Sequence, residues 1–115
     1  MSTEKPASVV RDHLAGVRSF ECDVNVAPDS QWTVVSGKFV HRMSVQQSYR
    51  FITQAWDFPI VSGFVSEISG TDALAELQLD NGNGYMKQVA AQYRVDDGRI
   101  VQASLKVSQA SQMHG

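Results

Sequence analysis

The sequence has little of the residue chemistry that builds metal sites or covalent crosslinks. Cys22 is the only cysteine among 115 residues, so no internal disulfide can form and no site of paired cysteines exists. The three histidines, His13, His41 and His114, lack the spacing of metal ligands. We therefore predict no metal, and no motif in the chain indicates a cofactor.

Clusters of one charge sign and long apolar runs are also absent. Ten Lys and Arg residues against twelve Asp and Glu residues give a net charge of −2, and neither sign forms a run. Surfaces that bind nucleic acid or anionic membranes need a basic patch, so we expect neither partner. No apolar run approaches the roughly twenty residues of a membrane span. The start of the chain, Met1 to Pro6, lacks the apolar core of a signal peptide, so a cytoplasmic location is the default expectation.

The overall composition is that of a globular protein. Apolar residues make up 43% of the chain and charged residues 19%, which is too apolar for a disordered chain. A length of 115 residues has room for one hydrophobic core. We predict a single domain that spans residues 1–115.

A long β-hairpin is the strongest pattern in the chain. Apolar and polar residues alternate from Tyr85 to Val95 and again from Val101 to Val107, on either side of the turn Asp96-Asp97-Gly98. Successive side chains of a strand point to opposite faces, so this alternation predicts one buried face and one wetter face. The residues expected to point inward near its centre are Val89, Ala91, Tyr93, Ala103 and Leu105.

Two more strands are predicted before this hairpin. They run from Ile60 to Ile68 and from Ala73 to Asp80, with a turn at Gly70-Thr71-Asp72 between them. The second strand joins the hairpin through Asn81-Gly82-Asn83-Gly84, and Gly and Asn tolerate the positive backbone angles of tight turns. The four strands form an antiparallel meander.

The N-terminal half contains two predicted helices. Ala7 to Val17 carries apolar residues at helical spacing on one face. Ser44 with Gln47 three residues later matches a capping box and marks the start of the second helix. Its apolar stripe consists of Val45, Tyr49, Ile52 and Trp56. Pro59 is expected to end this helix, because proline lacks the backbone donor that a helix interior requires.

The segment between these helices has a weaker pattern. Phe20 to Val26 is either a short helix or an irregular connector, which Pro28-Asp29-Ser30 closes. Trp32 to Val35 and Lys38 to Arg42 are expected to form a small hairpin, because Trp, Thr and Val favour a pleated surface. The complete order is α+β, with the helices on one face of a curved sheet.

This order of elements resembles the nuclear transport factor 2-like superfamily of cone-shaped domains. The stretches that carry the resemblance are Val9 to Val17 in the first helix, Ser44 to Pro59 in the second helix and Ala91 to Val101 in the final hairpin. The superfamily includes ketosteroid isomerases, SnoaL-like polyketide cyclases and limonene epoxide hydrolases. The resemblance implies a cystatin-like fold in which a curved antiparallel sheet wraps around the N-terminal helices, and it implies a homodimer formed through the sheet.

The catalytic groups of the steroid isomerases are incomplete in this chain. The resemblance places their Asp base near Trp32 to Val35, which has no carboxylate, and their protonated Asp donor at Ala91. Their tyrosine donor corresponds to His13. The isomerase reaction needs both the Asp base and the neutral Asp donor. The sequence therefore leaves open whether the protein is an enzyme.

An apolar pocket between the second helix and the final hairpin is the candidate site. The expected ligand-binding residues are Trp32 at its rim, together with Tyr49, Trp56, Ala91 and Tyr93. His13 is the candidate catalytic residue, as an acid, a base or an oxyanion donor. The alternative interpretation is that the aromatic residues fill the core and that His13 bonds to a backbone carbonyl.

Three functions are compatible with this pattern. The favoured prediction is a protein that binds a small hydrophobic molecule without chemistry. The second is a cofactor-free isomerase, cyclase or dehydratase that uses His13 with Tyr49 or Tyr93. The third is a dimeric interaction module without a ligand, which uses the outer face of the sheet. That face is expected to carry Gln88, Gln92, Arg94, Gln102, Ser104 and Lys106.

Overall fold

The computed structural model describes residues 5–108 and the strand at residues 111–112. The predictions that concern residues 1–4 and His114 lie outside these residues. The helices are α1 (Pro6–Arg18) and α2 (Val45–Ile52). The strands are β1 (Val26–Ser36), β2 (Phe39–Met43), β3 (Ile60–Glu67), β4 (Asp72–Asp80), β5 (Tyr85–Asp96), β6 (Arg99–Val107) and β7 (Ser111–Gln112).

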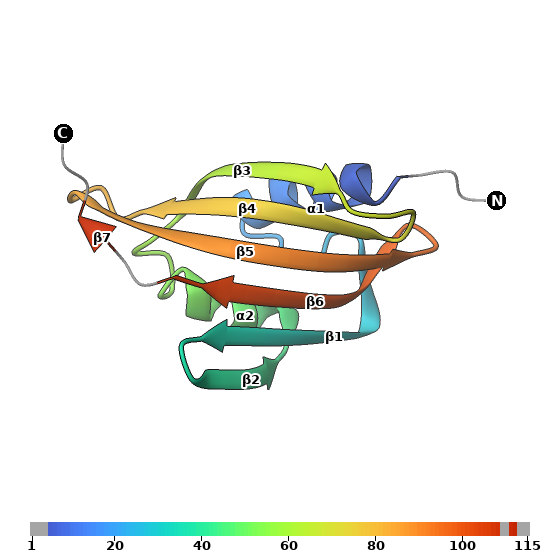
Figure 1. The fold of residues 1–115 in the computed structure, drawn as a ribbon, viewed down its shortest axis with the longest axis horizontal. Coiled ribbons are helices and arrows are strands. Elements are labelled where there is room, and N and C mark those ends of the chain that lie inside the picture. The colour runs from blue at the N-terminus through green and yellow to red at the C-terminus, as the bar shows by residue number, and fades with distance from the viewer. Residues whose placement is uncertain (1–4, 109–110, 113–115) are drawn as a thin grey trace.

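The strands form one curved, open sheet in the order β2-β1-β6-β5-β4-β3 (Figure 1). Strands β3 to β6 pair in antiparallel fashion along the chain, which confirms the predicted meander and its long final hairpin. One pairing was not predicted from the sequence. β1 lies parallel to β6, so the small first hairpin joins the sheet next to its last long strand.

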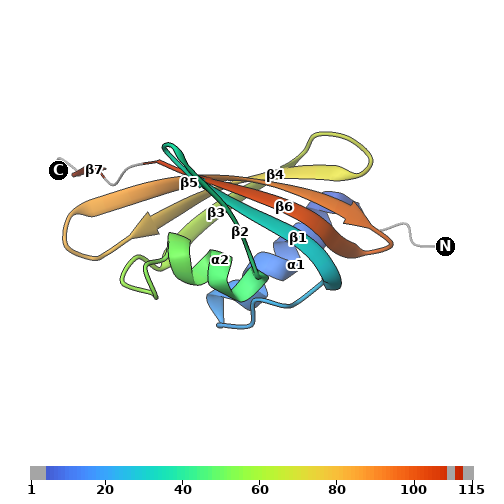
Figure 2. The ribbon, with the colours of Figure 1, turned by 90° about the horizontal axis from the view of Figure 1, so that it is seen from below.

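Both helices cover the same face of the sheet (Figure 2). Helix α1 begins with Pro6 in its first turn, where a missing backbone donor is harmless, and it buries an apolar stripe that includes Val10 and Leu14. Helix α2 begins with the predicted capping box: the Gln47 backbone N–H donates to Ser44 Oγ at 3.1 Å, and Ser44 N–H donates to Gln47 Oε1 at 3.2 Å. No helix in the part of the chain that the structure describes is long and apolar enough to cross a membrane.

Helix α2 ends earlier than the sequence predicted. It stops at Ile52, and the next residues turn in the left-handed region, with φ of 47° at Gln54, 52° at Ala55 and 82° at Trp56. The Thr53 hydroxyl donates to the Tyr49 carbonyl at 2.6 Å, and the same carbonyl accepts from the Thr53 backbone N–H at 3.0 Å. The prediction that Pro59 ends the helix is therefore wrong, because the chain reverses before it reaches this proline.

The connector from Phe20 to Asn25 is irregular, and it contains no second helix. Phe20 and Asn25 both adopt positive φ angles, of 65° and 57°. The Asn25 side-chain amide donates to the Val9 carbonyl at 3.2 Å, which ties the connector back to α1. Strand β1 then begins at Val26, earlier than the predicted start at Trp32.

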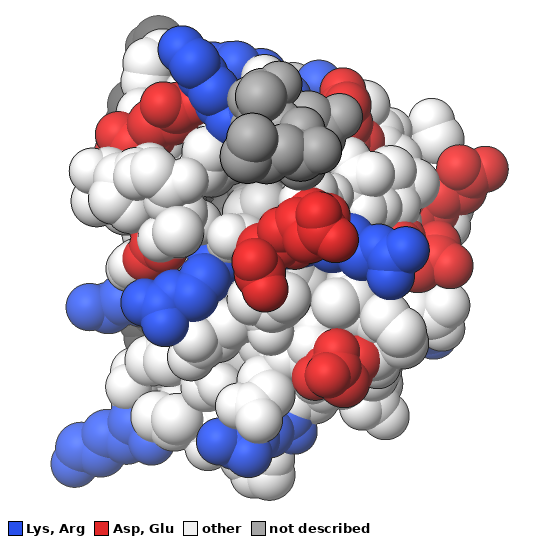
Figure 3. All heavy atoms as spheres, turned by 90° about the vertical axis from the view of Figure 1, so that its right-hand side faces the viewer, with Lys and Arg blue, Asp and Glu red and all other residues white. Residues whose placement is uncertain are grey.

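Charged side chains are distributed over the surface without a dominant sign. On the face shown in Figure 3, acidic and basic side chains are both present among neutral ones. Within the described residues, one ion pair joins Arg94 to Asp72, with 3.3 Å between Nε and Oδ1. The Thr71 hydroxyl bond to this carboxylate, together with Arg94, lowers the pKa of Asp72.

Candidate functional site

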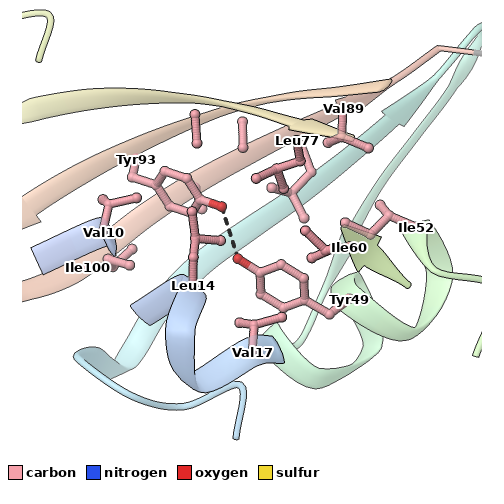
Figure 4. Packing of buried hydrophobic residues seen from close by; sticks show 14 of the residues in the cluster. Val10, Leu14, Val17, Tyr49, Ile52, Ile60, Leu77, Val89, Tyr93 and Ile100 are labelled. Carbon is pink, nitrogen blue, oxygen red and sulfur yellow. Dashed lines mark hydrogen bonds between the residues drawn. The ribbon is translucent and has the colours of Figure 1, made fainter. Parts of the chain in front are cut away.

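A chain of buried polar side chains crosses the space between the helices and the sheet. His13 comes from α1, Tyr49 from α2 and Tyr93 from β5, and all three are fully buried. Figure 4 shows the two tyrosine hydroxyl groups facing each other among apolar side chains of α1 and the sheet. Tyr93 lies between Ala73 and Ala103 on the neighbouring strands, so small residues leave room for its ring.

The hydrogen bonds that link these three side chains run in one direction, from Tyr93 through Tyr49 to His13. His13 Nδ1 lies 2.8 Å from the Val24 carbonyl oxygen, which can only accept, so Nδ1 carries the proton. In the neutral imidazole, Nε2 must then accept from the Tyr49 hydroxyl at 2.7 Å. The Tyr49 oxygen in turn accepts from the Tyr93 hydroxyl at 2.9 Å. Each hydrogen-bond donor of these three side chains therefore already has an acceptor within the protein.

Burial keeps these groups uncharged at neutral pH. Loss of hydration lowers the pKa of His13 to about 4, although the Val24 carbonyl and the charge of Asp23 act in the opposite direction. Burial also raises the pKa of Tyr49 and of Tyr93. In this arrangement neither nitrogen of His13 is free to contact a ligand, and the carbonyl bond that the alternative interpretation required is present.

Trp32 closes the cluster from the side of β1. The sequence placed this indole at a rim, but it is 1% exposed and its Nε1 donates to Ser30 Oγ at 2.9 Å. Its ring centroid lies 5.6 Å from that of His13 and 5.5 Å from that of Tyr49. The alanines of the sheet thus accommodate aromatic rings, and Ala91 is fully buried with them.

Trp56 lies apart from the other predicted site residues. The left-handed turn after α2 carries it away from the helical stripe, and it packs edge to face against Phe20 with 4.8 Å between ring centroids. The structure therefore brings together His13, Trp32, Tyr49, Ala91 and Tyr93, but it does not bring Trp56 to them.

A groove opens where the end of α2 faces the sheet. Its volume is about 620 Å³. One wall comes from α2 and the turn that follows it, and the other comes from the ends of β1, β5 and β6. The lining residues are Ser36, Arg50, Phe51, Gln54, Ala55, Lys87, Val107 and Ser108.

Lys87 is the unusual residue of this groove. It occupies an inward position of β5 and is 6% exposed. Its Nζ donates to the Ile52 carbonyl at 2.6 Å and lies 4.5 Å from the centroid of the Phe58 ring. Burial lowers the pKa of Lys87. Sequence reasoning missed this residue, although a lysine among the inward positions of an alternating strand was a visible signal.

The outer face of the sheet carries a second hollow, of about 750 Å³. A row of side chains crosses it through paired positions on four strands, in the order Phe64, Glu76, Ala90 and Lys106. Phe64 is 71% exposed. Ala90 lies between the two charged residues, and its small side chain forms a depression at the centre of the row. Among the described residues, no group of three or more His, Cys, Asp or Glu side chains could hold a metal ion.

Solved structures share this fold. A protein of unknown function with a cystatin-like fold from Xanthomonas campestris matches with a TM-score of 0.70 and 17% identity, over 95% of each chain. A candidate ketosteroid isomerase from Kribbella flavida matches with a TM-score of 0.67 and 14% identity, over 96% of this chain and 82% of that one. An LEH-like epoxide hydrolase from M. tuberculosis matches with a TM-score of 0.60 and 17% identity, over 89% and 81%.

These matches confirm the predicted fold class, an α+β cystatin-like fold of the nuclear transport factor 2-like kind. At the level of sequence, the chain matches no family description and no curated protein. Identities this low show the shared fold alone, because one fold can host many unrelated functions.

Proposed function

We propose that this protein binds a small, largely apolar molecule in the groove between α2 and the sheet. The observation that carries the proposal is the groove itself, about 620 Å³ in volume and lined by Phe51, Ala55 and Val107 together with a few polar groups. Ligand sites are typically concave, mostly apolar and furnished with a small number of polar side chains. The groove has this character, and its volume suits a molecule of one or two rings.

The closed interior supports this location for the ligand. The space beneath the helices is occupied by Trp32, Tyr49 and Tyr93, and their polar atoms already have partners within the protein. A ligand there would have to displace buried rings and break the hydrogen-bond chain. The groove needs neither change, because Phe51 is already 40% exposed.

The backbone of the groove wall also supports a functional role. Gln54, Ala55 and Trp56 are three consecutive non-glycine residues in the left-handed region, each of which costs roughly 1 kcal/mol or more. Strain of this kind persists where the surrounding structure requires a particular shape. Here the strained turn brings Gln54 and Ala55 to the side of the groove.

The groove can be tested with 2-naphthamide as an uncharged probe and Phe51→Ser as the disrupting variant. We expect the probe to raise the thermal midpoint in a saturable way, because a ligand of the folded state stabilises that state. Loss of the Phe51 ring should weaken binding by about tenfold, since apolar contact area is lost. Isothermal titration calorimetry gives the affinities.

Phe64→Ser is the matched control for this experiment. It removes the same side chain from the outer face of the sheet, where Phe64 is 71% exposed and does not line the groove. The control should bind 2-naphthamide as the unchanged protein does. Equal losses in both variants, or no saturable binding to the unchanged protein, would contradict the proposal.

We propose in addition that two copies pair through the outer face of the sheet. The cross-strand row Val35, Lys106, Ala90, Glu76, Phe64 is complementary to itself. A twofold axis along β5 above Ala90 sets Glu76 of one copy against Lys106 of the other and Phe64 against Val35. Ala90 at the centre allows close approach. Isologous interfaces require this kind of self-complementarity.

A charge reversal tests the pairing. Glu76→Lys places like charges against each other and should raise the dimer dissociation constant by about tenfold or more. Sedimentation equilibrium over a dilution series measures it. The double exchange Glu76→Lys with Lys106→Glu should restore pairing. The control Asp29→Lys, at an exposed position of β1 outside this row, should leave the dimer dissociation constant unchanged. A monomer at every concentration, or a dimer indifferent to Glu76→Lys, would refute this interface.

A further inference from the structure

We infer that the groove selects an anionic ligand, an apolar carboxylate whose charged end lies between Arg50 and Lys87. This inference rests on the proposed binding function and adds the chemical class of the ligand. It follows from the charges that line the groove, from the position of the Lys87 ammonium group, and from the arrangement of apolar and charged side chains along the groove.

The charged lining of the groove has one sign. Among the residues that the structure places around it, Arg50 and Lys87 are charged and both are positive. The Arg50 side chain is exposed, and within the described part of the chain it forms no ion pair. The whole chain has a net charge of −2, so two cations without a carboxylate partner in one groove are a local departure from its average.

The sheet itself does not require a lysine at position 87. Lys87 pairs with Leu79, and Leu79 pairs with Ile60, so this inward row is otherwise apolar. Burying an ammonium group is unfavourable unless a partner offsets the lost hydration. The Ile52 carbonyl accepts one of its three N–H groups and the Phe58 ring faces the nitrogen at 4.5 Å, which leaves a donor for another acceptor. An anion in the groove would supply that acceptor and would favour the charged form of the amine.

The end of α2 would ordinarily repel an anion, because the last carbonyls of a helix carry partial negative charge. Lys87 removes this obstacle, since its ammonium group lies on the Ile52 carbonyl at 2.6 Å. Arg50, two residues earlier on α2, can then offer its guanidinium fork to both oxygens of a carboxylate. Phe51, Ala55 and Val107 remain for the apolar body of the same molecule.

The test compares 2-naphthoate with 2-naphthamide, which have the same shape but differ in charge. We expect calorimetry at low salt to show that 2-naphthoate binds about tenfold more tightly than 2-naphthamide, because its carboxylate forms a charge-assisted hydrogen bond. Arg50→Gln should remove about that advantage, so that the two probes bind this variant with similar affinity. Arg42→Gln, on the exposed strand β2 outside the groove, is the matched control and should change neither affinity.

Lys87→Met provides a second variant that keeps the length of the side chain. It should also reduce the preference for 2-naphthoate, and the circular dichroism of the variant shows whether the fold is kept. Equal affinity of the two probes for the unchanged protein would overturn the anion assignment while the groove proposal stands. Unchanged 2-naphthoate affinity in Arg50→Gln would overturn it as well. Absence of binding by both probes would refute the groove and the anion assignment together.

Discussion

Tyr49→Phe is expected to lower the free energy of unfolding by about 3 kcal/mol, and Tyr93→Phe by only about 1 kcal/mol. The direction of the hydrogen-bond chain is the reason. The Tyr49 hydroxyl donates to His13 Nε2 and accepts from Tyr93, so its removal leaves two buried polar groups without partners. Removal of the Tyr93 hydroxyl leaves the bond between Tyr49 and His13 intact. Urea unfolding followed by circular dichroism measures both values.

The double variant Tyr49→Phe/Tyr93→Phe is the control for this asymmetry. Once Tyr49 is changed, the Tyr93 hydroxyl is an unpaired buried donor, so its removal should no longer be destabilising. The double variant should therefore be at least as stable as Tyr49→Phe alone, which is a clear departure from additivity. Equal effects of the two single variants, or strictly additive effects, would mean that the chain of bonds is not arranged as described.

Acid should weaken the fold through His13. The folded protein holds the pKa of His13 at about 4, below its ordinary value of 6.5, so the unfolded chain takes up a proton first as the pH falls. The stabilisation is complete above pH 6.5, declines between pH 6.5 and pH 4, and is lost below that range. The expected decrease in the free energy of unfolding is about 3 kcal/mol. Urea unfolding at a series of pH values measures it.

A variant without the titrating group isolates this contribution. His13→Gln should lack the decrease between pH 6.5 and pH 4, whatever its absolute stability. His41→Gln, on the exposed strand β2, should retain it. Asp72 affects a lower range, because its pKa is lowered and its stabilisation is lost as the pH falls below its ordinary value of 3.8. The same decrease in His13→Gln and in the unchanged protein would contradict the burial of a neutral imidazole.

The parts of the fold that depend on local signals were predictable from the sequence. The alternation from Tyr85 to Val107 gave the long hairpin and the correct inward residues, because a strand changes face at every residue. The capping box at Ser44 gave the start of α2, because its two hydrogen bonds involve neighbouring residues.

The features that depend on distant contacts were not predictable in this way. The end of α2 is set by the left-handed turn at Gln54, Ala55 and Trp56, which no helix-stop signal in the sequence marked. The groove exists because this turn faces strand ends brought together by the parallel pairing of β1 and β6. Neither the pairing nor the capping of Ile52 by Lys87 has a local signature.

The interior shows a related limit. The alanines on the inward face of the sheet indicated room, but the sequence could not show what fills it. Tyr93 lies between Ala73 and Ala103, and Trp32 pairs with Ala103 on its other side, so aromatic rings alternate with alanines across the strands. The same small residues would be equally consistent with an open cavity until the positions of these rings are known.

The most direct test of a binding groove at the end of α2 is a map of backbone amide chemical shifts during titration with 2-naphthoate. We expect saturable shifts to concentrate at Arg50, Phe51, Gln54, Ala55 and Lys87, which line the groove and not the outer hollow. Amides around Ala91 and His13, in the closed interior, should change little. Shifts centred on Ala91 and His13, or on Glu76 and Ala90 of the outer face, would place the ligand elsewhere and contradict the account.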